Sequence, residues 1–168
     1  KWGLYNRNWY DSNGKTPVEI AIYENRLSTV KVFLKEMPSG SFAGANGWHL
    51  LKAAVETNSV SMLEMLLDQG MDVNLTSELK ESCIYMACKT QFIDGVEFLL
   101  KRNADINIAE ISNGWTPLFI ACVIGNEEIV RMLLEAKSSV CMLDRLGWTA
   151  MEHAGFRGFL KIAEMAKP

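Results

Sequence analysis

Apolar residues recur in short clusters along the chain, and polar or glycine-containing stretches separate the clusters. Val18, Ala21 and Ile22 are spaced three and four positions apart, as on one face of a short helix. Val30 and Leu34 show the same spacing in the next cluster. The pattern predicts two short amphipathic helices in succession, joined by a turn.

This pair of helices recurs with a period of about 33 residues. Its clearest marker is a glycine, here called the opener, that begins a similar four-residue motif at Gly14, Gly47, Gly114 and Gly147. The first two openers are 33 residues apart, as are the last two, and the 67 residues between Gly47 and Gly114 leave room for another. Lys80 takes the glycine position of that missing opener. The chain is therefore predicted to contain five helix pairs.

Two further positions keep the same phase in all five blocks. An alanine stands seven residues after each opener, at Ala21, Ala54, Ala87, Ala121 and Ala154. An apolar residue stands sixteen after it, at Val30, Leu63, Val96, Val130 and Ala163. Alanine between larger residues indicates that two helices approach closely there. Because one pair buries only part of its apolar surface, the pairs should stack around a continuous core.

Capping signals place the start of the first helices. Thr16 and Thr116 each precede a proline, which combines an N-cap residue with a residue suited to the first helical position. Thr16 with Glu19, and Thr149 with Glu152, also have the spacing of a capping box. Helices are therefore predicted to begin directly after these threonines.

A period of 33 with Gly-x-Thr-Pro-Leu, an alanine, Val-x-x-Leu-Leu and a closing Gly-Ala-Asp-Val-Asn resembles the ankyrin repeat, over residues 11–167. The resemblance implies an all-α ankyrin-repeat solenoid of about five helix-turn-helix repeats with hairpin-like loops, used to bind proteins. The family's histidine after Thr-Pro-Leu is absent, so its hydrogen bonds cannot be assumed. That position holds Glu19, Lys52, Tyr85, Phe119 and Glu152.

The phase of the openers sets the expected repeat boundaries. Repeats 1 to 5 are predicted at 11–43, 44–76, 77–110, 111–143 and 144–168, and the fifth is expected to act as a C-terminal cap. Residues 1–10 are expected to end a preceding, degenerate repeat. Since the chain opens with Lys1 rather than methionine, we expect it to be part of a longer protein.

Composition and charge exclude several classes of function. With 49% apolar and 22% charged residues the chain is too rich in core-forming residues for disorder. A net charge of −3 without a basic region disfavours nucleic acid as a partner. Apolar runs are too short to cross a membrane, and no signal peptide is visible. Four cysteines lie in apolar runs without a CxxC pair, so we expect a reduced, cytoplasmic monomer.

Patterns for catalysis or for cofactor and metal binding are missing from the sequence. Gly14-Lys15-Thr16 looks like the end of a phosphate-binding loop, but Trp9 stands where that loop needs a glycine. His49 and His153 are 104 residues apart and have no cysteine or carboxylate at metal-ligand spacing. We expect no catalytic residue, no cofactor and no metal ion.

Candidate partner-binding residues occupy the position directly after each opener. It holds Lys15, Trp48, Glu81, Trp115 and Trp148, and stacking would bring the three tryptophans into a row along the loop edge. Tryptophan concentrates contact energy in interfaces. The alternative is that each indole ring packs on the neighbouring loop.

A second candidate position lies at the end of each first helix, which in ankyrin-like proteins belongs to the concave face. There Val123, Ile124 and Phe156 are apolar where polar residues are usual. We therefore predict a binding patch on repeats 4 and 5. The complete predicted set is Trp48, Glu81, Trp115, Val123, Ile124, Arg145, Trp148, Phe156 and Arg157.

One segment points to a narrower group of ankyrin proteins. Residues 146–163, with Glu152-His153-Ala154 and Phe156-Arg157-Gly158, look like the last ankyrin repeat of fungal glycerophosphocholine phosphodiesterases and their phosphate-pathway relatives. Those proteins carry an SPX domain before the repeats and a glycerophosphodiesterase domain after them. The resemblance implies a regulatory middle segment of such a hydrolase. A related resemblance, to the fungal inhibitor of a cyclin and cyclin-dependent-kinase pair, would imply a kinase-docking surface.

Overall fold

The computed structural model describes residues 11–36 and 45–165, which form helices and loops without a strand. The first helices of the pairs are α1 (Pro17–Tyr23), α3 (Ala45–Glu56), α5 (Cys83–Lys89), α7 (Pro117–Ile124) and α9 (Ala150–Phe156). The second helices are α2 (Leu27–Glu36), α4 (Val60–Asp68), α6 (Ile93–Lys101), α8 (Glu127–Glu135) and α10 (Leu160–Met165). The predicted all-α solenoid of five helix pairs is confirmed.

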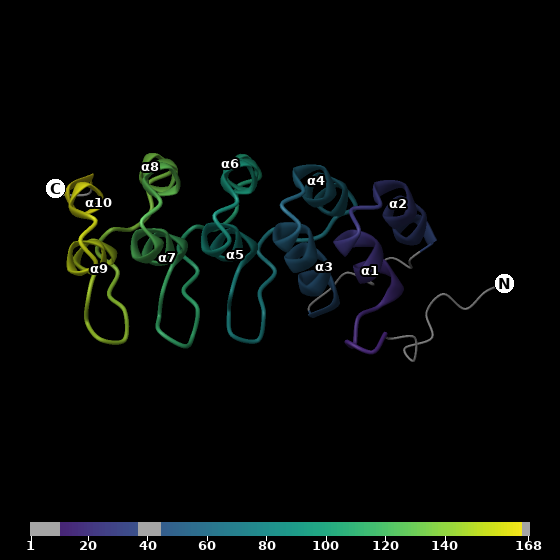
Figure 1. The fold of residues 1–168 in the computed structure, drawn as a ribbon, viewed down its shortest axis with the longest axis horizontal. Coiled ribbons are helices and arrows are strands. Elements are labelled where there is room, and N and C mark those ends of the chain that lie inside the picture. Colours follow the sequence, from purple (N-terminus) through teal and green to yellow (C-terminus); the bar gives the residue numbers. More distant parts are fainter. Residues whose placement is uncertain (1–10, 37–44, 166–168) are drawn as a thin grey trace.

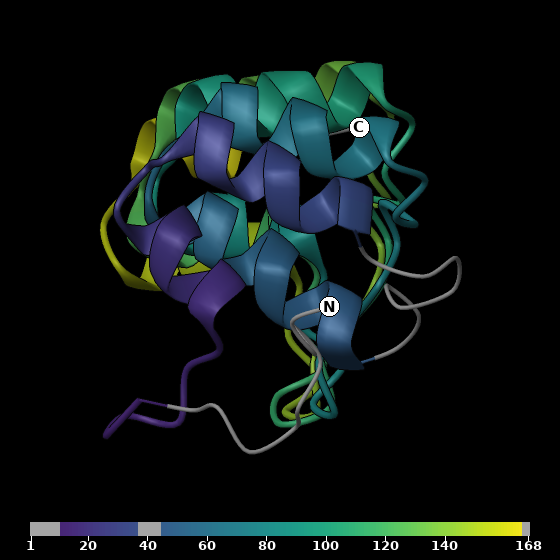
Figure 2. The ribbon, with the colours of Figure 1, turned by 90° about the vertical axis from the view of Figure 1, so that its right-hand side faces the viewer.

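The helix pairs stack along one axis in the order of the chain (Figure 1). First helices form one row and second helices the other, and the main helix contacts join partners within a pair or neighbours in a row. Long hairpin loops extend from the row of first helices before α5, α7 and α9. Seen along the stack, these three loops lie one behind another (Figure 2).

The core is a band that continues from pair to pair between the two rows. All five repeated alanines are buried, and so are the apolar residues nine positions later, except the partly buried Ala163. The largest fully buried side chains, among them Ile22, Leu63, Leu99 and Ile162, are spread over all the pairs. Stability is therefore distributed along the stack.

Two first helices begin with the predicted capping box. In α9 the Thr149 hydroxyl accepts a hydrogen bond from Glu152 N, and the Glu152 carboxylate accepts one from Thr149 N at 2.6 Å. Thr16 and Glu19 make the same bonds at α1. In these two repeats, where the family's histidine is missing, the glutamate carboxylate thus accepts hydrogen bonds from the N-cap threonine.

The hairpin loops share one closing device. A polar side chain at the base of each loop accepts hydrogen bonds from backbone N–H groups two to five positions later; these residues are Asp11, Ser77, Glu110 and Asp144. The turn needs a positive φ, which glycine adopts without strain at Gly114 and Gly147. Lys80 has a φ of 61° at the same place. It therefore occupies the glycine position that the period assigned to it.

Hydrogen bonds also connect each loop to the next repeat. The Asn74 side-chain carbonyl accepts from Asp105 N at 2.8 Å, and that of Asn107 accepts from Ser139 N at 3.1 Å. At the loop tips, Ile111 N donates to the carbonyl of Leu79, and Arg145 N to that of Asn113. The asparagine that closes the repeated Gly-Ala-Asp-Val-Asn signature thus joins one repeat to its successor.

The second helix pair departs from the sequence-based expectation. The period puts His49 at the repeat position that Thr16 and Thr149 occupy before their helices, but α3 begins at Ala45 and contains both Trp48 and His49. Every helix pair lies within one predicted repeat. The prediction for residues 1–10, and the end of the predicted C-terminal cap at 166–168, lie outside the described residues.

Candidate functional site

The three tryptophans that follow an opener do not form the expected exposed row. Trp48 is only 3% exposed and belongs to the core, because α3 includes it where the other repeats have a hairpin. The structure therefore does not support Trp48 as a partner-binding residue. Trp115 is partly buried and packs against the core, whereas Trp148 is 38% exposed.

Trp115 packs on the next hairpin, as the alternative interpretation expects. Its indole Nε1 donates a hydrogen bond to Asp144 Oδ2 at 3.3 Å, and its ring meets the ring of His153 edge-on with 5.5 Å between centroids. The packing and binding interpretations thus apply to different tryptophans: Trp115 braces the loops, and Trp148 leaves part of its ring in solvent.

His153 is the centre of an aromatic cluster that sequence reasoning missed. Its ring centroid lies 5.3 Å from that of Trp148 and 6.0 Å from that of Phe119, and its Nε2 lies 2.8 Å from Asp144 Oδ2. One repeat earlier, Ile120 occupies the same position. A histidine where the preceding repeat has an isoleucine was the signal available in the sequence.

Asp144 joins this cluster to the hairpin backbone. Its burial raises the carboxyl pKa, but hydrogen bonds from Trp148 N, His153, Trp115 and Leu146 N outweigh burial and lower the pKa to about 2. The carboxylate is therefore ionised at neutral pH, and its bonds to two loops and one helix hold Trp148 in place.

Phe156 extends the cluster into solvent. It is 79% exposed at the end of α9, and its ring meets that of Trp148 edge-on at 5.5 Å. We call Trp115, Trp148 and Phe156 the aromatic patch. Arg157 and Arg145 of the predicted set also lie in repeat 5, Arg157 directly after Phe156 and Arg145 on the hairpin, beside Gly114. Val123 is connected to Arg157 because its carbonyl accepts a hydrogen bond from Arg157 Nη1 at 3.3 Å.

Most of the corresponding side chains in repeats 1 to 3 are charged and interact with one another or with Tyr23. Glu81, a predicted site residue, accepts a hydrogen bond from Lys89 Nζ at 3.1 Å. Glu56 accepts one from the Tyr23 hydroxyl at 2.6 Å, and Lys15 Nζ lies 3.3 Å above the Tyr23 ring. The surface therefore changes from internally paired charges to exposed aromatic rings along the stack.

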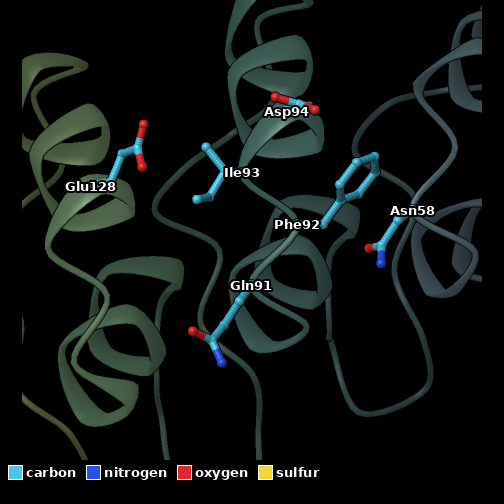
Figure 3. Close-up of a pocket in the computed structure, with 6 residues that line it drawn as sticks. All are labelled: Asn58, Gln91, Phe92, Ile93, Asp94 and Glu128. Atoms are coloured by element: carbon cyan, nitrogen blue, oxygen red, sulfur yellow. The ribbon is translucent and has the colours of Figure 1, made fainter.

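A separate hollow lies at the turns between first and second helices (Figure 3). It has a volume of about 470 Å³, is open to solvent, and is lined by Asn58, Gln91, Phe92, Ile93, Asp94 and Glu128. Its two carboxylates belong to the first turns of α6 and α8, where acidic residues favour the helix itself. Helix stabilisation accounts for the acidic lining of this hollow.

The described ranges, 11–36 and 45–165, hold no group of three or more histidine, cysteine, aspartate or glutamate residues that could bind a metal ion. Cys83 and Cys122 are buried thiols, and burial raises the pKa of each to about 12. None of the helices described is long and apolar enough to cross a membrane.

Comparison with known proteins gives one family along the chain. A family model described as ankyrin repeats in three copies matches residues 3–77, 40–110 and 84–166. The glycerophosphocholine phosphodiesterase of Candida albicans is 36% identical over 179 residues, which covers 100% of this chain and 15% of the relative. That of Eremothecium gossypii is 35% identical over 142 residues, covering 83% and 10%.

A relative of another kind is the putative palmitoyltransferase ZDHHC13 of Danio rerio, 32% identical over 142 residues, which covers 83% of this chain and 22% of the relative. The chain thus spans less than a quarter of the length of each of these three relatives. They share with it a segment, and their names describe much longer proteins.

Proposed function

This chain belongs to the ankyrin repeat family, and we propose that it is a non-catalytic protein-interaction module that binds its partner through repeats 4 and 5. The observation that carries the proposal is the exposed pair of Trp148 and Phe156, held in place from below by Asp144 and His153. Burial of a large aromatic side chain contributes about 1.5 to 3 kcal/mol of stabilisation, which each of these exposed side chains could still gain by binding a partner.

Exposed apolar side chains gather in the last repeat. Of the eight large hydrophobic residues that are exposed in the described ranges, four belong to it, and a fifth, Leu143, directly precedes it; the four are Leu146, Trp148, Phe156 and Leu160. Apolar side chains concentrated in one region mark an interaction surface more often than a solvated one.

The aromatic patch is also preorganised. The Trp148 backbone N–H donates to Asp144 at 2.9 Å, and the Trp148 ring packs between those of His153 and Phe156. A side chain already fixed in its bound position loses little conformational entropy when a partner binds. The fixed position of its ring therefore supports Trp148 as a partner-binding residue.

We further propose that the module is the regulatory ankyrin segment of a cytoplasmic glycerophosphodiester phosphodiesterase whose catalytic domain lies outside this chain. Support comes from the two fungal phosphodiesterases, one of which aligns with the whole chain. The partner is then a separate protein or a flanking domain of the same chain, bound by a monomeric module without nucleic acid.

Site-specific photo-crosslinking in the full-length protein tests the interaction proposal. A benzoylphenylalanine is introduced at Phe156, and in a matched control at Val32, which is 62% exposed on α2 in repeat 1. We expect crosslinks from position 156 to one defined surface, in the same chain or a partner, and few from position 32. Equal, scattered crosslinking from both positions would contradict the proposal.

The second proposal is tested by activity. The full-length protein should hydrolyse glycerophosphocholine, and the double variant Trp148→Ala/Phe156→Ala should change its kcat or KM whereas Val32→Ala should not. Absence of hydrolysis by the full-length wild-type protein would refute the phosphodiesterase assignment and leave the interaction proposal standing.

A further inference from the structure

Two arginines flank the aromatic patch. Arg157 follows Phe156 directly, and Arg145 lies in the hairpin that carries Trp148, with its side chain beside Gly114. Both are exposed, and neither forms an ion pair with a carboxylate of the described residues. Toward the rest of the described chain, their guanidinium groups donate one hydrogen bond, from Arg157 to the Val123 carbonyl. Most of their N–H donors are therefore available.

Three carboxylates of the adjoining hairpins and of α9 are already engaged within the fold. Asp144 is 8% exposed, and Glu110 is 4% exposed and accepts from three backbone N–H groups. Burial raises the pKa of Glu110, but those bonds outweigh it and lower the pKa. Glu152 is bound to Thr149 in the first turn of α9, where the helix terminus favours its charge. These oxygens do not neutralise the arginines.

In repeats 2 and 3, basic side chains of this surface pair with glutamates of the same repeat. Lys89 pairs with Glu81 at 3.1 Å and Lys52 with Glu56 at 3.6 Å. In repeat 5 the corresponding acidic partners are absent from the surface, and aromatic side chains stand in their place. A carboxylate next to an apolar side chain would complement the available guanidinium groups of Arg145 and Arg157 and the exposed rings of Trp148 and Phe156.

From this complementarity we infer that the patch binds an acidic peptide segment of its partner. An apolar side chain of the peptide packs against Trp148 and Phe156, and its carboxylates accept paired hydrogen bonds from Arg145 and Arg157. The inference rests on the proposed function and adds the chemistry of the partner to it.

Three labelled peptides of equal length test the inference by fluorescence anisotropy with the full-length protein. One alternates glutamate with leucine, the second replaces glutamate by lysine, and the third replaces leucine by serine. We expect the glutamate–leucine peptide to bind about tenfold more tightly than either of the others. Its binding should weaken when salt rises from about 0.05 M to about 0.3 M, because the exposed charges are then screened. Tighter binding of the lysine–leucine peptide would overturn the inference.

Variants separate the contributions of charge and aromatic surface. Arg145→Ala and Arg157→Ala should each weaken the glutamate–leucine peptide by about three- to tenfold, and Arg131→Ala, an exposed arginine on α8, should not. The double reversal Arg145→Glu/Arg157→Glu should transfer the preference to the lysine–leucine peptide. Arg157→Lys retains the charge but loses the planar fork, so it should give an intermediate affinity.

The outcomes distinguish this inference from the proposed function. If Trp148→Ala/Phe156→Ala abolishes peptide binding and the arginine variants bind as the wild type does, the patch is an interface and its acidic specificity is refuted. If peptides do not bind and position 156 also gives no defined crosslink, both proposals fail.

Discussion

Three threonines at the start of first helices occupy the same repeat position but differ in what their hydroxyl groups bond. Thr16 and Thr149 each complete a capping box with a glutamate three residues later. At α7 that later position holds Phe119, and the buried Thr116 hydroxyl has no hydrogen-bond partner among the described residues. The same repeat position therefore carries a capping hydroxyl group at α1 and α9 and an unsatisfied one at α7.

Replacing these threonines by valine should have different effects. Thr149→Val should lower the free energy of unfolding by about 1 kcal/mol, because it removes a helix cap. Thr116→Val should leave it unchanged or raise it by up to about 1 kcal/mol, since a desolvated hydroxyl is replaced by a methyl group of similar shape. Urea denaturation measures the free energy of unfolding of both variants, and equal decreases in this free energy would contradict the assignment of Thr116 as unsatisfied.

Asp144 is expected to be the most sensitive acidic residue. Asp144→Asn weakens the bonds to two loops and one helix and should lower the free energy of unfolding by about 1 to 3 kcal/mol. Asp105→Asn is the matched control, because Asp105 is exposed and accepts a single backbone hydrogen bond, from Asn107 N at 2.9 Å. A comparable loss in both variants would show that the cluster adds nothing to the turn.

The same carboxylate predicts a pH dependence. The pKa of Asp144 falls from 3.8 to about 2 on folding, so the stabilisation from its charge is fully present above pH 3.8 and is lost as the pH falls toward 2. The difference in unfolding free energy between wild type and Asp144→Asn should therefore be constant near neutral pH and shrink below pH 3.8. Urea titrations at several pH values measure it; a constant difference down to pH 2 would contradict the assignment.

Sequence reasoning at this scale succeeded where the interacting residues are close in the chain. Thr149 and Glu152 are three residues apart, and their bonds follow from helix geometry. The Trp115–Asp144 bond joins residues 29 apart and depends on how two hairpins lie beside each other. Trp148 and Phe156 were predicted as surface residues, but the buried support below them was visible only in three dimensions.

At the scale of helices, the ends of α7 and α9 offer a matched comparison. Both are followed by a glycine with positive φ, 87° at Gly125 and 85° at Gly158. A Cβ at Gly125 would lie 2.4 Å from Phe159 Cζ, whereas a Cβ at Gly158 would have no heavy atom within 4 Å. The backbone conformation is the same, and the surroundings differ.

Alanine at these two glycines should separate backbone strain from crowding. Gly158→Ala should cost about 1 kcal/mol because alanine is strained at positive φ. Gly125→Ala should cost about 1 kcal/mol more, since the Phe159 ring must also move. Thermal unfolding compares the variants, and adding Phe159→Ala to both should abolish the difference. A difference that persists would assign the extra cost to something other than this ring.

The start of α3 shows where prediction of helices from the period fails. Thr16, Ser82, Thr116 and Thr149 stand at the N-cap of the other first helices, but His49 takes that position in the second pair. Histidine does not cap a helix as a short hydroxyl side chain does, so the helix extends back to Ala45. The burial of Trp48 follows from this extension.

For the whole molecule, stacking in one dimension predicts different effects of destabilising substitutions in different repeats. A substitution in the terminal repeat should unfold mainly that repeat, whereas one in a central repeat should destabilise the neighbouring repeats as well. Leu99→Ala, in the fully buried core of α6, should lower the global free energy of unfolding by about 2 to 5 kcal/mol. Ile162→Ala, in α10, should mainly unfold its own repeat.

Hydrogen exchange measured by mass spectrometry distinguishes these two cases. Ile162→Ala should reduce protection over 144–165 and leave 45–135 close to wild type, whereas Leu99→Ala should reduce it across the stack. Uniform loss in the Ile162→Ala variant would show that the five pairs unfold as one cooperative unit.

The links between hairpin tips give the stack uneven mechanical compliance. Between repeats 3 and 4 the tips are joined by the backbone bond from Ile111 to Leu79, and between repeats 4 and 5 by the one from Arg145 to Asn113. Only the second junction is reinforced by the Trp115–Asp144 bond. When the solenoid bends, the hairpin tips should therefore separate first between repeats 3 and 4, and repeats 4 and 5 should move together as one rigid unit.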